Sequence, residues 1–517
     1  MFAISLGLFI VRFLVPTPVG QADNHDGPRL TCVLGVEPAT RGYSRWFQYA
    51  YFEFVPSAGC GHFPRYPSSQ LVPLELARVL TWVTGLPGTL NLIALGVLTC
   101  VIASFGIVSL AAGLRLRLWA QLAVAAVAWL IMADAAFFDV YASPFSEPAA
   151  LIGLLLVAAG VVYLGRGWRE TVFGLVLAGS GGLLAILAKE QYLTMAVPVC
   201  LTLVLASATR GGGRGLRRFW TRQARAAIMV AALLATMTAA YALWDRTSRY
   251  ATGLHREQVV DVVFSEIVTR HDEHARADLR ALGLPASWAK YAGTNSFGRF
   301  TVLHDPLYPR YEAKLSDGTI THFLLTHPRS TVSIGQHAAI YAQQLRVTYL
   351  GNYAPGAGHR PGATESRVAV LTWLMHRLPR QLGLLWYVPL WAAMAAIAIA
   401  ALFVPRGRAW RRDGAFLVLC MTGCAIAAFI PAAYLDGIST SRHMVGMNIA
   451  TALAFPISIG LSISMMRQAL ARARQRSSRT DTGDITRPAR RKPDVPRLTP
   501  GSGPARRLTG SYAGRVP

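Results

Sequence analysis

The sequence predicts an all-α fold, a polytopic transmembrane helical bundle. Composition is the first indication, because 53% of the 517 residues are hydrophobic and only 15% are charged. The second is that apolar runs of about 20 residues recur, which is the length that crosses a hydrocarbon core of roughly 30 Å. The third is that arginines concentrate in the short segments between these runs. This pattern indicates a bundle of about ten spans in a lipid bilayer.

Ten apolar segments fit this description. They lie near residues 1–16, 88–112, 118–138, 147–164, 171–188, 192–208, 223–244, 383–404, 413–434 and 442–465. The first is short and contains Arg12. It lacks a small-residue cleavage site, so we expect a retained helix rather than a signal peptide. Either the true translation start lies upstream of Met1, or Arg12 faces protein in a short, tilted span.

The basic residues predict the topology. A net charge of +25 would suggest nucleic acid as the partner of a soluble protein. Here the arginines fill loops that all fall on one side of the membrane if the ten spans are correct, and the positive-inside rule makes that side cytoplasmic. They are Arg115, Arg117, Arg166, Arg169, Arg210, Arg214, Arg217, Arg218, Arg222, Arg225, Arg406, Arg408, Arg411, Arg412 and those that follow Arg467. We therefore expect a multi-pass protein of the inner or plasma membrane, with both termini cytoplasmic and no nucleic-acid partner.

The spans divide the chain into four regions. These are an N-terminal bundle at 1–244 with its first outer loop at 17–87, an extracytoplasmic segment at 245–382, three C-terminal spans at 383–465 and a basic tail at 466–517. Within the extracytoplasmic segment, apolar spacing at 259–267, 279–285 and 332–350 predicts a helical cap. The tail is rich in Arg, Pro, Gly and Ser without apolar periodicity, so we expect it to be disordered.

Four polar clusters lie at span boundaries on the predicted outer face. They are Asp23-Asn24-His25-Asp26, Ser146-Glu147, Lys189-Glu190-Gln191, and Asp436 through Arg442-His443. Each has an ordinary explanation: aspartates cap turns, Glu147 suits a helix N-terminus, Lys189 can reach the membrane interface, and Arg442 and His443 can contact lipid headgroups. Ionisable groups are nevertheless costly in a membrane bundle, and four clusters on one face indicate a shared site.

The cysteines also separate into two groups. Cys32 and Cys60 lie in the first outer loop, whereas the other four lie in predicted spans. Because an exterior compartment is oxidising, we expect a Cys32–Cys60 disulfide, with two free thiols as the alternative.

The four clusters carry a resemblance to a known family. The run from Pro16 to Leu30 resembles the first outer loop of bacterial multi-pass membrane glycosyltransferases of the GT-C superfamily, in particular the actinobacterial and firmicute hexose transferases of glycan biosynthesis. Phe145 to Ala149, Ala188 to Gln191 and Asp436 to Met444 are similar to three further landmarks, in the same order. The resemblance extends from about residue 16 to 460. His25 replaces a glycine common in relatives, and the DxD pair of some members is spaced here as Asp23-x-x-Asp26.

The resemblance implies transfer of a hexose from a polyprenyl-phosphate sugar to an envelope glycan or glycolipid on the outer face, with inversion at the anomeric carbon. Asp26 or Asp23 would act as the base, and the altered spacing leaves open which. Lys189, Arg442 and protonated His443 would neutralise the lipid phosphate. Glu147 would orient substrate hydroxyls, or else complete an oxygen-ligand site for Mg²⁺ or Mn²⁺ with Asp23 and Asp26. The remaining substrate-binding candidates are His25, Gln191 and Asp436.

Two other classes of function compete with an enzyme. A lipid-linked sugar transporter or flippase would place charges near the bilayer midplane in repeated halves, whereas here they lie at span boundaries and no halves match. A non-catalytic envelope-assembly protein would have no need of all four clusters. The enzyme hypothesis requires Asp26, Glu147, Lys189 and Arg442 to line one cavity, and it fails if they lie more than about 15 Å apart, beyond hydrogen-bonding reach.

Overall fold

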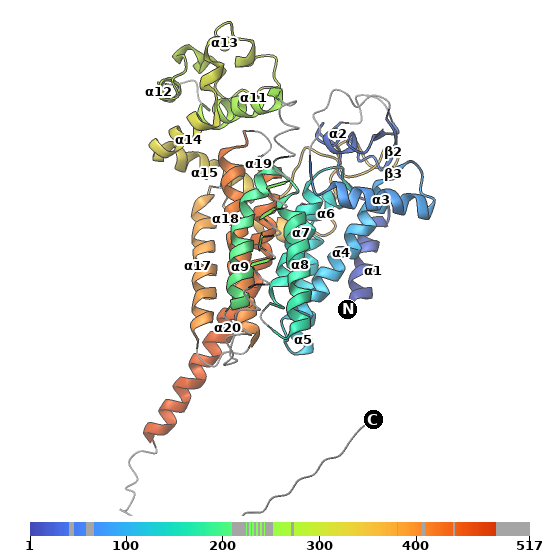
Figure 1. Ribbon diagram of the computed structural model, residues 1–517, viewed down its shortest axis with the longest axis vertical. Helices are drawn as coiled ribbons and strands as arrows, with labels where there is room; N and C mark the ends of the chain where they lie inside the picture. Colours follow the sequence, from blue (N-terminus) through green and yellow to red (C-terminus); the bar gives the residue numbers. More distant parts are fainter. Residues whose placement is uncertain are drawn as a thin grey trace, which may run out of the picture. The chain divides into compact units, whose positions relative to one another are not determined.

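The computed structural model is mostly helical (Figure 1). It describes residues 1–40, 46–57, 67–164, 166–208, 252–269, 273–379, 381–404, 409–437 and 440–481, with isolated residues between 224 and 242. The chain divides into two units, Met1–Met465 and Met466–Pro517. All the features described below that concern the candidate site belong to the first unit.

Six helices among the described residues are long and apolar enough to cross a membrane. They are α4 (Leu92–Gly113), α8 (Trp168–Ile186), the segment Glu190–Ser207 formed by η3 (Glu190–Met195) and α9 (Ala196–Ala208), α17 (Leu384–Phe403), α18 (Ala409–Tyr434) and the Val445–Gln475 part of α20 (Val445–Asp481). The predicted transmembrane bundle is thereby confirmed.

The count of ten spans stays a prediction. The expected span at 118–138 is a bent pair, α5 (Leu118–Met132) followed by α6 (Ala135–Phe138) and η2 (Asp139–Ala142), with a bend of 58°. Counting that pair as one span gives seven. Two further expected spans are shorter apolar helices, α1 (Phe2–Leu14) and α7 (Glu147–Val161). In the expected span at 223–244 only isolated residues are described, and more than half of it lies outside the described residues.

Helix α7 is the centre of the bundle, and every residue in it is buried. It packs closely on α8 because glycines face each other: a Cβ on Gly153 would lie 2.6 Å from the Gly181 carbonyl oxygen, and one on Gly160 would lie 2.4 Å from the Ala178 nitrogen. Small residues permit such close approach between membrane helices. As a result, Glu147, the first residue of α7, begins inside the protein with 1% of its surface exposed.

A buried network of charges ties α1 and α6–η2 to a later loop, residues 344–369. Arg12 forms an ion pair with Glu365 and donates from Nε to the Ala133 carbonyl oxygen at 3.2 Å. Arg346 pairs with Asp139 at 2.7 Å. Arg12 is 5% exposed, so it faces protein, as expected for a short first span.

A small antiparallel sheet lies between residues 36 and 91, an addition to the expected all-α fold. Strands β1 (Val36–Pro38), β2 (Glu53–Pro56) and β3 (Leu90–Asn91) pair in the order β1-β2-β3. The strands have only two to four residues each, so they present too little alternation to be seen in the sequence. Two helices flank the sheet, α2 (Pro28–Thr31) and α3 (Leu71–Thr84).

Residues 252–269 and 273–343 form the expected helical cap, with a hydrophobic cluster of its own around Phe264 and Trp288; its extracytoplasmic location stays a prediction. Its elements are α11 (Thr252–Asp261), the π-helix η4 (Val262–Ile267), α12 (Glu273–Ala281), η5 (Ala286–Tyr291), η6 (Val302–His304), α13 (Tyr308–Tyr311), η7 (Glu312–Lys314), α14 (Asp317–Thr326) and α15 (Pro328–Gln343). The helix expected at 332–350 ends at Gln343, because Leu345 has a left-handed φ of 52°.

Loop 344–369 returns to the first outer loop instead of continuing the helix. Its backbone hydrogen bonds run from the Gly20 and Ala22 nitrogens to the Asn352 and Gly351 carbonyl oxygens, at 3.0 and 2.8 Å. The short helices α16 (Val370–Arg377) and, later, α19 (Thr440–His443) complete the first unit. The tail expected to be disordered from 466 begins instead as helix, since α20 continues to Asp481. Its residues 466–475 are rich in Ala, Arg, Gln, Leu and Met, which favour helix.

Candidate functional site

Arg442 on α19 is the centre of the site. Its guanidinium donates to Asn24 Oδ1 at 2.9 Å and to the Asp26 carboxylate, and its Nε lies 3.3 Å from Glu147 Oε1. The side chain is 4% exposed. One buried cation therefore joins the first, second and fourth of the predicted polar clusters.

Apolar packing positions this cation. The guanidinium lies 5.0 Å from the centre of the Phe145 ring, a cation–π arrangement. Phe145 itself packs in a buried cluster with Ala22, Val347 and Leu350. That cluster joins the first outer loop, the α7 entrance and loop 344–369 beneath the charged groups. Behind α19, Gly437 packs on the backbone of Asp261, where a Cβ would lie 2.2 Å from the carbonyl carbon.

Lys189 comes from the third predicted cluster, just after α8 ends at Ile186. Its Nζ is buried and has no hydrogen-bond partner among the described residues. The backbone before it is fixed, since Ser68 Oγ donates to the Ala188 carbonyl oxygen at 2.6 Å. Burial and the nearby charge of Arg442 lower the pKa of Lys189 to about 7, although Glu147 and Asp26 favour its charged form.

The two aspartates of the first loop differ in their surroundings. Burial favours the neutral form of Asp26, but Arg442 and Arg29 outweigh it and hold the pKa of Asp26 well below its usual range. Asp23 accepts a hydrogen bond from the Gly27 nitrogen at 2.9 Å. Burial, helped by the charge of Asp26, raises the pKa of Asp23 to about 7. Asp26 is thus a permanently ionised partner of arginine, whereas Asp23 can exchange a proton near neutrality.

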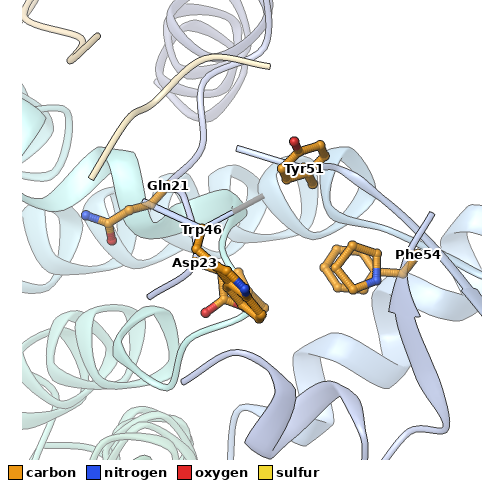
Figure 2. Close-up of a pocket in the computed structure, with 7 residues that line it drawn as sticks. Gln21, Asp23, Trp46, Tyr51 and Phe54 are labelled. Atoms are coloured by element: carbon orange, nitrogen blue, oxygen red, sulfur yellow. The ribbon is translucent and has the colours of Figure 1, made fainter. Parts of the chain in front are cut away.

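Asp23 also lines a small pocket with Gln21, Pro38, Trp46, Tyr51, Phe54 and Pro144. Figure 2 shows Asp23 and Trp46 together at the pocket wall between Gln21 and Phe54. The Phe47 nitrogen donates to the Asp23 carbonyl oxygen at 2.9 Å, which holds these two segments together. Gly27 permits this turn, because a Cβ there would lie 2.1 Å from Asp23 Oδ2.

His25 packs on aromatic side chains of the first loop. It has a left-handed φ of 79°, and its ring packs on Trp46 with 3.9 Å between ring centres. The substrate-binding role expected of His25 stays a prediction. The structure gives it a visible packing role at the rim of the Asp23 pocket.

Gln191 and Asp436 both contact His443. Gln191 Nε2 donates to the His443 carbonyl oxygen at 3.0 Å, and the Asp436 carboxylate contacts the His443 ring. Burial, together with the charge of Lys189, lowers the pKa of His443 well below its usual value. The neutral imidazole is therefore favoured, which corrects the expectation that a protonated His443 neutralises a phosphate.

The oxygen-ligand site for Mg²⁺ or Mn²⁺ is not formed by these residues as they stand. Arg442 is paired with both Asp26 and Glu147, so the carboxylates face a guanidinium. Across the described part of the chain, no group of three or more His, Cys, Asp or Glu side chains is arranged to hold a metal ion.

The cysteine prediction is tested only in part. Cys32 is disulfide-bonded. The expected partner, Cys60, lies outside the described residues. Cys100, Cys200, Cys420 and Cys424 are free.

Comparison with known proteins assigns the family. Residues 1–477 match the model of the YfdI N-terminal transmembrane domain. The chain belongs to this family. No curated protein and no solved structure matches it. Membership in the YfdI N-terminal transmembrane domain family, with the six long apolar helices, establishes a membrane protein.

In this member of the YfdI N-terminal transmembrane domain family, two contributors to the site, Arg29 and Tyr349, escaped the sequence prediction, whereas Asn24 belongs to the first predicted polar cluster. Asn24 and Arg29 lie beside the predicted aspartates. Asn24 accepts a hydrogen bond from Arg442, and Arg29 pairs with Asp26 at 3.2 Å. Their place in the same turn was a usable signal. Tyr349, in loop 344–369, lies close enough to Arg442 to act on its charge, and nothing in the local sequence distinguished it.

Proposed function

We propose that this membrane protein transfers a hexose from a polyprenyl-phosphate donor to a glycan or glycolipid acceptor at the membrane surface. The proposal rests on the presence of two kinds of group in the same site. The first is the buried Lys189 beside Arg442, which has no hydrogen-bond partner among the described residues. The second is the Asp23 carboxylate, whose pKa is about 7. The cations can stabilise an anionic leaving group, and the carboxylate can act as a general base.

The donor phosphate would bind at Lys189 and Arg442. Arg442 is held in place by Asp26 and Glu147, and their two negative charges compensate its own. Lys189 has no hydrogen-bond partner among the described groups, so an incoming phosphate oxygen would supply one. Fixed cations that meet the charge developing on a leaving group lower the barrier without reorganisation at the moment of reaction.

Asp23 is the better base of the two aspartates. A base works best when its pKa lies near the operating pH, which favours Asp23 over the arginine-paired Asp26. In the proposed step Asp23 accepts the proton of the acceptor hydroxyl while that oxygen forms a bond to the anomeric carbon. The bond from this carbon to the phosphate oxygen breaks, and the polyprenyl phosphate leaves with the electron pair. A single displacement inverts the anomeric centre.

Glu147 and Asp26 act as positioning residues in this scheme. Both hold the guanidinium, from different elements, so that Arg442 keeps one orientation when the site is empty or occupied. Gln191 and Asp436 hold His443 beside it.

The test is transfer from labelled polyprenyl-phosphate hexoses to membrane acceptors by the purified protein. We compare the wild type with Asp23→Asn, Asp26→Asn and the control Asp317→Asn, which lies on the exposed start of α14. Asp23→Asn should lower kcat by about 10²- to 10⁴-fold, the usual contribution of a general base. The control should match the wild type.

Lipid movement in the same vesicles separates the flippase alternative. If no donor supports transfer and the four forms move labelled lipid across the vesicle membrane at equal rates, the transferase proposal is wrong.

A further inference from the structure

Helix α3 carries an apolar stripe that no described residue covers. Val72, Leu76, Val79 and Val83 follow the spacing of one helix face, and each is between 49% and 65% exposed. Trp82 beside them is 83% exposed. The opposite face of α3 is buried through Leu74, Ala77 and Thr81, so the helix is apolar on both sides.

The two ends of α3 are fixed to the ends of two membrane spans. At its start, Ser69 Oγ donates to the Leu184 carbonyl oxygen at 2.6 Å, in the last turn of α8. Towards its end, Thr81 Oγ1 accepts from the Asn91 nitrogen at 2.9 Å, just before α4 begins. Since α8 ends and α4 begins at these contacts, α3 lies across the bundle at one membrane surface. Figure 1 shows α3 crossing the direction of α4 and α8.

The stripe lies at the same end of the bundle as surface that lipid must cover. The end of α1 meets the start of α4, where the Phe13 ring leaves no room for a Cβ on Gly96. The outward residues of α1 near that end, Val11 and Val15, are more than half exposed. Lipid chains alone can cover such a face on a short apolar helix of the bundle. The α3 stripe lies at the same end of α4.

We propose that α3 lies in the membrane interface, with its stripe of Val72, Leu76, Val79 and Val83 in the acyl region and Trp82 at the headgroup level. Tryptophan is enriched at this level because its ring is amphipathic, and an apolar helix face of this kind binds the headgroup–acyl boundary. Glu75 and Arg78 pair at 3.7 Å and remain about half exposed, as polar groups at the edge of such a face. This inference does not depend on the proposed enzyme activity.

The anchoring has a consequence for the site. The residues before α3 hold the chain next to Lys189, since Ser68 bonds the Ala188 carbonyl and the Ser69 nitrogen bonds that of Leu187 at 2.9 Å. A helix fixed in the interface therefore sets Lys189 at the level of lipid phosphates. If α3 were instead a loop in water, it would not fix the depth of Lys189 relative to the membrane.

Spin labels measure the position of the stripe directly. A nitroxide is attached to Val79→Cys in a background in which Cys100, Cys200, Cys420 and Cys424 are replaced, and the protein is placed singly in phosphatidylethanolamine–phosphatidylglycerol nanodiscs. Val176→Cys on α8 is the lipid-facing reference, and Leu325→Cys on α14 is the reference on the cap; both side chains are more than half exposed. The ratio of oxygen to nickel-chelate collisions reports lipid against water.

We expect the ratio at position 79 to be several-fold above that at 325 and close to that at 176. A ratio equal to that at 325 places the stripe in water and overturns the proposal. Low collision rates with both reagents mean that another segment of the same chain covers the stripe, which overturns the proposal as well.

A second measurement avoids the cysteine background. Brominated lipids quench tryptophans near the acyl region, and the difference in quenching between wild type and Trp82→Phe isolates Trp82. We expect this difference in quenching to be largest with bromine near the headgroups and to decrease as the bromine moves deeper into the acyl region. Equal quenching of the two forms at every bromine depth would contradict an interfacial Trp82.

Discussion

The first unit contains two buried charge clusters, and they are built differently. The Arg442 cluster consists of Asn24, Asp26, Glu147, Lys189 and Arg442. The Arg346 cluster consists of Arg12, Asp139, Arg346, Asn352 and Glu365. Both draw on segments far apart in the sequence, and both bury arginine almost completely.

Every charge of the Arg346 cluster has an opposite partner. Arg12 pairs with Glu365, and Arg346 with Asp139. Asn352 joins the pairs by accepting from Arg346 at 2.6 Å and from the Glu365 nitrogen at 3.0 Å. The charges cancel and the groups lock loop 344–369 to the bundle.

The Arg442 cluster contains a second cation, Lys189, that forms no hydrogen bond among the described residues. Arg442 is matched by Asp26 and Glu147, while Lys189 Nζ is buried without a hydrogen-bond partner in the described structure. A buried ammonium without a partner is costly for folding. This difference supports a structural role for the Arg346 cluster and is consistent with the proposal that Lys189 of the Arg442 cluster binds a ligand.

The largest effect should follow from Arg442→Met. This change leaves the buried Glu147 without its arginine partner and leaves Asp26 with Arg29 alone, and breaking a buried pair in this way costs about 3–5 kcal/mol. We expect loss of sugar transfer together with a lower unfolding midpoint in detergent. Arg78→Met, at an exposed pair on α3, is the matched control and should change neither. An Arg442→Met protein with wild-type transfer would contradict the central place of this cation.

Glu365→Gln should destabilise the Arg346 cluster by a comparable amount, since both Arg12 and Arg367 lose their charged partner. The double variant Arg12→Met/Glu365→Met removes both charges and should recover much of the loss. Thermal unfolding of the three forms measures this coupling. The rate of sugar transfer per folded molecule should change little in the Arg12→Met/Glu365→Met variant. If this variant folds but does not transfer sugar, the Arg346 cluster has a direct role in the reaction.

The sequence was sufficient to predict that the four polar clusters meet. Ionisable residues at the ends of apolar spans are conspicuous, and the helical bundle brings span ends on one side together. Asp26, Glu147 and Arg442 are in direct contact as expected. Arg12 could likewise be assigned to the protein interior, because a charge in so short a span has few alternatives.

The remaining features depend on contacts that leave no local pattern. Asp23 and Asp26 are equivalent in the sequence, and only the positions of Arg442 and Arg29 separate their pKa values. Loop 344–369 is attached by backbone bonds, such as that from the Gly351 nitrogen to the Phe47 carbonyl oxygen at 2.8 Å. Backbone bonds are independent of side-chain pattern, so neither Tyr349 nor the short sheet could be placed in advance.

Lys189→Met sharpens the comparison because it should separate stability from function. Removing an unpartnered buried cation should leave the unfolding midpoint unchanged or raise it. Donor binding should weaken by about 10- to 100-fold, since a hydrogen bond to a charged group contributes about 1.5–3 kcal/mol. KM for the labelled polyprenyl-phosphate hexose and thermal unfolding are measured side by side. A variant that unfolds earlier but keeps its KM would place Lys189 with the structural charges.

The smallest expected effect concerns the pH dependence of transfer, which also tests the role of Lys189. As pH falls below about 7, Asp23 becomes protonated and loses its capacity as a base, and as pH rises above about 7, Lys189 loses its charge. The wild type should therefore show a narrow, bell-shaped profile of kcat/KM around neutrality. Lys189→Arg should keep the acid limb and lose the alkaline one, because a guanidinium remains charged throughout this range. Asp317→Asn should reproduce the wild-type profile. An alkaline limb that persists unchanged in Lys189→Arg would show that another group titrates there, and the buried lysine would then lose its assignment as the phosphate ligand.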